Sequence, residues 1–203
     1  LAVTIPMVGT CVYLLLHGLI PFIKEYQAGR ILAWFYPDRY GEARYQQNNS
    51  IIAIGSGQLK GKGLFNTTIA SVKNGNFLSE EQTDFIFAVA GEELGFIGSV
   101  FIILLLFLIV VECIITSRKA KDLSGKIICC GVAGVVGFQS FLNICVATGV
   151  LPNTGTPLPF VSYGLTSLVS LYIGMGLVLN VGLQNRRYLG GEKNEHWLHR
   201  TRI

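Results

Sequence analysis

Residues 96–115 read FIGSVFIILLLFLIVVECII, and Glu112 is the only formally charged side chain among these twenty positions. A helix of about 20 apolar residues is long enough to cross the hydrocarbon core of a bilayer. Three further stretches have the same character, and the predicted transmembrane helices are residues 1–23, 86–115, 127–150 and 160–184. None of the apolar stretches carries the charged face that helices of a soluble protein present to water, so the sequence predicts a membrane protein.

The distribution of charge predicts an orientation. Charged residues make up 14% of the chain, against about 25% in soluble domains, and basic residues gather in the link 116–126 and the tail 185–203. Short basic loops stay in the cytoplasm, so these two segments are predicted to be cytoplasmic. The loop 24–85 and the turn 151–159 are then extracytoplasmic. The predicted fold class is an all-α polytopic membrane protein, with four transmembrane helices and one long extracytoplasmic loop.

The composition also excludes several classes of protein and site. The five cysteines lie in the apolar stretches, where they are interpreted as small core residues rather than metal ligands or disulfides. The net charge of +4 comes mainly from residues at helix ends and does not indicate nucleic-acid binding. The first apolar stretch has no basic segment or cleavage site before it, so it is not predicted to be a signal peptide. We expect the chain to be the C-terminal part of a longer protein.

Local patterns predict some structure within the long loop. Residues 45–54 are predicted to form a short helix lying on the membrane, and the glycine-rich segment 55–63 is predicted to be irregular. Residues 79–81, with the sequence Ser-Glu-Glu, are typical of a helix start. The apolar run from Phe85 would continue into the second transmembrane helix, which places Asp84 near its outer mouth.

The sequence GQLKGKG at residues 57–63 superficially resembles a phosphate-binding P-loop. The match fails, because Ser56 stands where a P-loop has its first glycine and Gly63 stands where it has Ser or Thr. What remains is a flexible backbone that carries Lys60 and Lys62 and suits an anionic group such as a phosphate. The alternative is a solvated turn without a ligand.

Acidic residues cluster on both sides of the start of the second predicted transmembrane helix, at residues 80–84 and 92–93. Carboxylates at a membrane surface can act as general bases or hold a divalent cation. The alternative interpretation is a set of interfacial acids in contact with water.

Residues 149–166, GVLPNTGTPLPFVSYGLT, interrupt an otherwise apolar hairpin with three prolines and three further helix-breaking glycines. Broken backbone at membrane depth must line a cavity or be buried in protein, so a pocket next to Asp84 is predicted near the outer leaflet. In the helix before this segment, Gln139 and Asn143 lie four residues apart on one face. Their amides are expected to serve mainly as packing and hydrogen-bonding groups between helices.

Several motifs in register resemble those of one protein family. The matching segments are YQAGRI at 26–31, PD at 37–38, YQ at 45–46, Ser50, AIGSG at 53–57, GKG at 61–63, TDFIFAV at 83–89, GEELGFIG at 91–98, LPNTG at 151–155 and LPFVSYG at 158–164. Over most of its length the chain resembles the C-terminal half of the SEDS proteins (shape, elongation, division and sporulation), which include RodA and FtsW. It departs from the usual family pattern at Ser79, Gln82, Gln58 and Leu165.

The resemblance implies a bundle of about ten helices, of which this chain would supply the last four. It implies an inverting peptidoglycan glycosyltransferase that polymerises lipid II, with the family's essential aspartate at Asp84. Lys62 is the candidate contact for the diphosphate, and Glu92, Glu93 and Thr83 are further candidates for substrate binding. A divalent cation is the one cofactor considered, with its ligands unknown, and no organic cofactor is expected.

The resemblance also implies a location and partners. The protein would lie in the bacterial plasma membrane with its active face outside. Its partners would be lipid II, a class B penicillin-binding protein that acts as transpeptidase, and the missing N-terminal half. Two alternative functions remain: a flippase for the lipid-linked precursor, and a non-catalytic scaffold for a transpeptidase. A flippase would have polar residues throughout its spans, and the spans here are mostly apolar.

Overall fold

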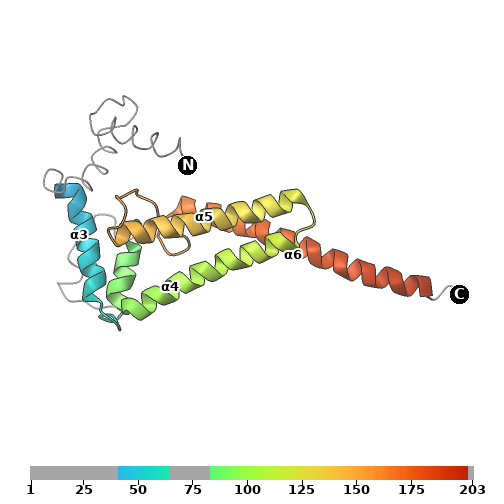
Figure 1. Ribbon diagram of the computed structural model, residues 1–203, viewed down its shortest axis with the longest axis horizontal. Coiled ribbons are helices and arrows are strands. Elements are labelled where there is room, and N and C mark those ends of the chain that lie inside the picture. The colour runs from blue at the N-terminus through green and yellow to red at the C-terminus, as the bar shows by residue number, and fades with distance from the viewer. Residues whose placement is uncertain (1–40, 65–82, 201–203) are drawn as a thin grey trace, which may run out of the picture.

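The computed structural model describes residues 41–64 and 83–200 (Figure 1). The regular structure in these ranges is helical, and its elements are α3 (Gly41–Ser56), α4 (Ile86–Lys119), α5 (Leu123–Ala147) and α6 (Leu165–Arg200). For this part of the chain the predicted all-α class is confirmed. The first predicted transmembrane helix, residues 1–23, and the predicted helix start at 79–81 lie outside the described residues.

Among the described residues, three helices are long and apolar enough to cross a membrane: Ile86–Lys119, Leu123–Ala147 and Leu165–Gln184. Many of their large apolar side chains point away from the neighbouring helices, and Phe107, for example, is 61% exposed. Contiguous apolar surface on this scale is unfavourable in water, whereas a lipid or a further transmembrane helix can cover it. The chain is therefore a polytopic membrane protein.

The helix bounds differ from the predicted spans at several ends, and α4 continues to Lys119 while α5 ends at Ala147. α5 begins at Leu123 rather than at residue 127, because the polar residues 124–126 already have helical geometry. α6 begins at Leu165 rather than at residue 160. Pro159 precedes a turn in which Phe160 has a φ of 63°, which a helix cannot contain. α6 also continues to Arg200, so most of the tail predicted at 185–203 is helical.

The helices α4, α5 and α6 pack against one another, and a tight link joins α4 to α5 at one end of this bundle (Figure 1). Near that link, Cys113, Cys129, Ala133 and Val178 form a buried cluster. Small residues let transmembrane helices approach closely, and this explains the cysteines here. The interpretation of the cysteines as core residues is confirmed for Cys113 and Cys129, whereas Cys130 is exposed.

The helix α3 lies across the other end of the bundle (Figure 1), where it contacts both α4 and α5. A buried cluster of Ala53, Phe85, Ala88 and Val146 joins α3 to the start of α4 and the end of α5. The short helix predicted at 45–54 is thus confirmed and is longer at both ends. Its proposed position on the membrane surface stays a prediction.

Candidate functional site

The helix α4 is interrupted at Gly95, whose backbone angles are φ 70° and ψ −167°. Because the helix breaks, the N–H groups that follow need partners outside it. The glycine-rich loop supplies them: the N–H of Phe96 donates to the carbonyl of Gln58 at 2.8 Å, and that of Ile97 donates to the carbonyl of Leu59 at 3.3 Å. The loop therefore caps the start of the long second part of α4.

The same loop caps the end of the short first part of α4. The N–H of Lys62 donates to the carbonyl of Glu92 at 2.9 Å, and the N–H of Gly63 donates to the carbonyl of Glu93 at 3.1 Å. Backbone groups of residues 58–63 thus bond to two N–H groups and two carbonyls at the break. Irregular backbone inside a membrane protein requires this kind of internal satisfaction.

Three glycines allow the loop and the broken helix to approach backbone to backbone. A Cβ at Gly57 would collide with the carbonyl of Gly91, and one at Gly61 would collide with that of Glu93. A Cβ at Gly95 would collide with the backbone N of Gly61. The segment 55–63 was predicted to be irregular, which is confirmed for residues 57–63, whereas residues 55–56 belong to α3. The prediction that its backbone is flexible is wrong, because the loop is packed against α4.

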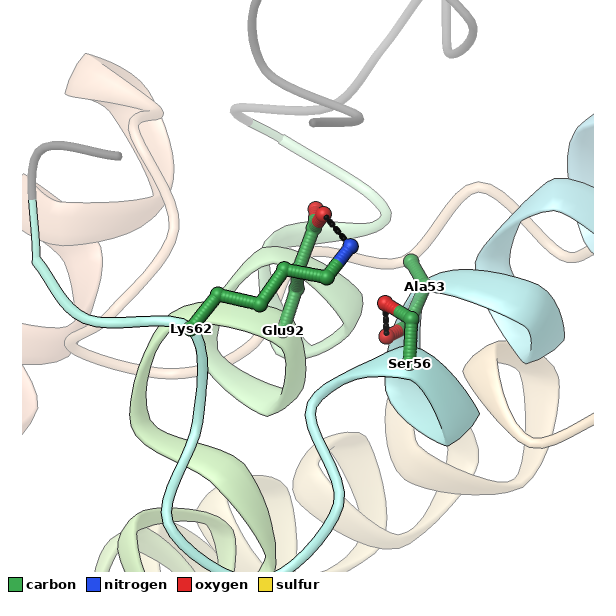
Figure 2. A network of polar contacts seen from close by, with 4 residues as sticks. All are labelled: Ala53, Ser56, Lys62 and Glu92. Carbon is green, nitrogen blue, oxygen red and sulfur yellow. Dashed lines mark hydrogen bonds and ion pairs between the residues drawn. The ribbon is translucent and has the colours of Figure 1, made fainter. Parts of the chain in front are cut away.

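An ion pair closes this junction (Figure 2): Lys62 Nζ lies 2.7 Å from Glu92 Oε1. The Glu92 side chain is only 2% exposed and that of Lys62 is 29% exposed. In the same view Ser56 Oγ donates to the carbonyl of Ala53 within α3, at 2.7 Å. A buried carboxylate requires a charged or hydrogen-bonding partner, so Lys62 has a structural role besides any contact with substrate.

We expect Lys62→Ala to lower the free energy of unfolding by about 2 kcal/mol. The substitution removes a charged partner of the buried Glu92 carboxylate. Breaking an ion pair in this way costs about 3–5 kcal/mol when both partners are buried, and exposure of Lys62 to solvent reduces this figure. Denaturation of the purified protein, followed by helical circular dichroism, measures the difference.

Two matched variants complete this test. Lys60→Ala removes a lysine from the exposed part of the same loop and should change the stability by less than about 0.5 kcal/mol. Adding Glu92→Gln to Lys62→Ala removes the buried charge and should restore most of the loss. A double variant as unstable as Lys62→Ala would show that the ion pair is not the cause.

Asp84 lies just before α4, in a segment held by two buried side chains. Asn143 Nδ2, from α5, donates to the backbone carbonyl of Asp84 at 2.8 Å. Ser162 Oγ, from the segment between α5 and α6, donates to the carbonyl of Thr83 at 2.6 Å. The next residue, Phe85, is completely buried. The predicted proximity of Asp84 to the interrupted segment 149–166 is therefore confirmed.

Two polar side chains of α3 fix the end of α5 near this segment. Gln47 Nε2 donates to the carbonyls of Val146 at 2.9 Å and Leu151 at 2.7 Å. Ser50 Oγ donates to the carbonyl of Ala147 at 2.8 Å. The last carbonyls of a helix have no partner within it, so these side chains satisfy the end of α5 and set the position of α3.

The structure groups the predicted site residues in two places. Lys62 and Glu92 form the ion pair, and Glu93 is next to it, partly buried. Thr83 and Asp84, also partly buried, lie at the start of α4 beside α5. The side chains described at residues 45–64 and 83–184 include no group of three His, Cys, Asp or Glu suited to a metal, and the acids at 80–81 lie outside these ranges.

A cavity of about 360 Å³ lies at the opposite end of the bundle from Asp84, lined by Lys121, Asp122, Asn180 and Gln184 among others. The pocket expected next to Asp84 stays a prediction.

Sequence reasoning gave no role to Ser162, Gln47 or Ser50, and it gave Asn143 only a general packing role. Each donates to a backbone carbonyl far away in the sequence. Two signals were available, since Ser50 and Ser162 lie in the motifs quoted above and polar side chains at membrane depth need partners. The identity of those partners depends on the packing of separate segments.

Comparisons with known proteins agree with this architecture. Residues 1–187 match the cell cycle protein family FTSW_RODA_SPOVE. A relative from Enterococcus hirae named "probable peptidoglycan glycosyltransferase FtsW" is 38% identical over 183 residues, which cover 89% of this chain and 45% of that protein. Stage V sporulation protein E of Bacillus subtilis is 37% identical over 201 residues, which cover 89% and 54%.

A solved structure gives the same result at the level of the fold. One chain of a peptidoglycan synthase complex, described as coordinating polymerization and crosslinking, superimposes with a TM-score of 0.60 at 31% identity. The match covers 88% of this chain and 48% of that one. The chain thus spans about half the length of the curated relatives it matches. From the extent of these matches, the chain belongs to the FtsW, RodA and SpoVE family of cell cycle proteins.

Proposed function

We propose that this chain is the C-terminal half of a peptidoglycan glycosyltransferase that polymerises lipid II into glycan strands. The observation that carries the proposal is the placement of Asp84 at the start of a broken membrane helix, with the backbone on both sides of it held by buried side chains. The family and the names of its relatives supply the reaction class. An aspartate that merely faced water would have no need of such support.

In the proposed reaction, Asp84 is the general base. The 4-hydroxyl oxygen of the acceptor sugar attacks the anomeric carbon of the donor, and its proton passes to the Asp84 carboxylate. The bond from that carbon to the diphosphate breaks, and undecaprenyl diphosphate leaves. The configuration at the carbon inverts. General bases of this kind contribute about a hundredfold to ten-thousandfold to rates.

Positive charge near the departing diphosphate would stabilise the transition state. We propose that Lys62 contributes to it, with Glu93 and Thr83 orienting the substrate and Glu92 holding the lysine in place. A divalent cation would supply further charge, but the step above does not depend on it. The Lys62→Ala/Glu92→Gln variant tests the lysine, because it should regain stability and yet have a lower kcat/KM for lipid II than wild type.

The membrane arrangement extends the proposal. Four spans in this chain, including residues 1–23, would join an N-terminal half in a bundle of about ten helices. The exposed Gly131 and Gly134 on α5 support this, because a Cβ at either position would meet nothing within 4 Å and another helix could approach closely. The loop 24–85 would face outward from the plasma membrane. A class B penicillin-binding protein is the proposed partner, and the related synthase complex supports a partner of this kind.

The test is reconstitution of the complete protein with its partner in vesicles that contain lipid II labelled on the sugar. We expect glycan strands, resolved as a ladder on a gel, and their digestion by lysozyme. Movement of lipid II between leaflets without polymer would favour the flippase. Crosslinking by the partner without any polymerisation by this protein would favour the scaffold.

A further inference from the structure

We propose that Asn143 and Ser162 are positioning residues that fix the direction of the Asp84 side chain by holding the peptide groups on either side of it. This inference rests on the proposed role of Asp84 in catalysis. Ser162 donates to the carbonyl of Thr83, which belongs to the peptide before Asp84. Asn143 donates to the carbonyl of Asp84, which belongs to the peptide after it.

Two hydrogen bonds are enough to fix the direction of the Cα–Cβ bond of Asp84. The only soft backbone dihedrals at Asp84 are φ and ψ, and each is the rotation of one flanking planar peptide about the Cα. Fixing both peptides therefore fixes the direction of the Cα–Cβ bond. Asp84 lies in the turn that precedes the helix, since α4 begins only at Ile86. The N-cap residue of α4 is Phe85, whose side chain makes no capping hydrogen bond.

The side-chain amide of Asn143 holds the carbonyl of Asp84 but leaves its own oxygen without a hydrogen bond among the described residues, which lowers stability. It is 1% exposed, and its Nδ2 donates to the carbonyl of Asp84 and, at 2.6 Å, to that of Thr156. Both partners are carbonyl oxygens, so Nδ2 must face them. In the flipped orientation Oδ1 would face the two carbonyls and repel them. Oδ1 has no hydrogen-bond partner among the described residues. A buried unsatisfied acceptor costs about 1–3 kcal/mol, which is consistent with retention for a functional reason.

Ser162 is held in a strained turn. It is 2% exposed, and its Oγ accepts the N–H of Leu158 at 2.7 Å. Because Oγ is the acceptor in that bond, its own hydrogen donates to the carbonyl of Thr83. Within the same turn Phe160 has a φ of 63°, a conformation that is unfavourable for a bulky residue. Strained residues of this kind occur where the surrounding structure enforces a functional arrangement.

The test is a double-mutant cycle on the complete protein with lipid II as substrate. Ser162→Ala and, separately, Asn143→Leu should each lower kcat about 10–100-fold, because small displacements of a catalytic group have effects of this size. The KM for lipid II should stay within about twofold of wild type. In the Asp84→Asn background the same substitutions should change the residual rate by less than about twofold, since a group that acts only through the carboxylate has nothing left to position.

Ser140→Ala is the matched control. Ser140 is 7% exposed on the same helix as Asn143, but its hydroxyl bonds within that helix, to the carbonyl of Val136. This variant should keep kcat. Melting temperatures of all the variants show which of them fold, and if Ser162→Ala does not, Asn143→Leu carries the test.

The remaining outcomes separate the positioning role of Asn143 and Ser162 from the catalytic role of Asp84. An equal loss of rate in the wild-type and Asp84→Asn backgrounds, or a higher KM with unchanged kcat, would overturn the positioning role while leaving the proposed function intact. Full activity of Asp84→Asn alone would instead overturn the catalytic role of Asp84 and the positioning role with it.

Discussion

Replacement of Asp84 by Asn is expected to lower the rate of glycan polymerisation by about a hundredfold to ten-thousandfold. The substitution keeps the size of the side chain and its capacity for hydrogen bonds but removes the charge and the basic oxygen. The backbone bonds to Asn143 and Ser162 do not involve the side chain, so the protein should still fold, insert and bind its partner. The measurement is the initial rate of polymer formation from lipid II by the complete protein.

The competing explanation for Asp84 is that it caps α4. Asn caps helices as well as Asp does, so a capping role predicts near-normal activity of Asp84→Asn. The structure gives this explanation little support, since the N-cap position is occupied by Phe85. Asp122→Asn, which removes a carboxylate before α5 at the opposite end of the bundle, is the matched control and should keep its activity. Polymer yield from Asp84→Asn within about twofold of wild type would refute the catalytic assignment.

Gly95→Ala is expected to have the largest effect on stability, a loss of about 3 kcal/mol or more. The backbone angles of Gly95, φ 70° and ψ −167°, lie in a region that is essentially restricted to glycine and costs other residues about 1–3 kcal/mol. A Cβ would also meet the backbone N of Gly61 and the carbonyl of Leu59. These are backbone atoms of the capping loop, so they cannot move aside without breaking the bonds that satisfy α4.

Thermal unfolding and the yield of monodisperse protein in detergent would measure this loss. Gly55→Ala is the control, because Gly55 lies in α3, at the start of the glycine-rich segment, and a Cβ there meets nothing within 4 Å. It should be neutral or stabilise the protein by up to about 1 kcal/mol. A melting temperature of Gly95→Ala equal to that of wild type would show that the loop and α4 separate without cost.

Much of the secondary structure could be predicted from the sequence because local composition determines it. Twenty apolar residues in succession predict a spanning helix whatever surrounds them, and 86–115, 127–150 and 160–184 each correspond to a helix of the structure. The predicted start of the last helix differs from the observed one because a turn precedes α6. The beginning of α6 at Leu165 depends on the conformation of Phe160, which has no signature in the apolar pattern.

The candidate site was predictable only in part. Its charged members, Asp84, Lys62 and Glu92, could be found from charge in an apolar context and from the family motifs. The pairing of Lys62 with Glu92 could not, because 30 positions separate them and no local pattern reports the approach of the loop to α4.

The sequence by itself determined that this chain is a membrane protein of apolar helices with carboxylates near the start of one of them. These properties depend on composition along a single segment and on the cost of placing charge in lipid. Tertiary structure alone decided that a glycine-rich loop caps both sides of the break in α4, and that Asn143 and Ser162 hold the peptides flanking Asp84. The physical reason is that every residue has the same backbone carbonyl, so the sequence carries no local signal for the carbonyls that need a side-chain partner. Which side chain will satisfy such a carbonyl depends on the packing of segments that are distant in the sequence.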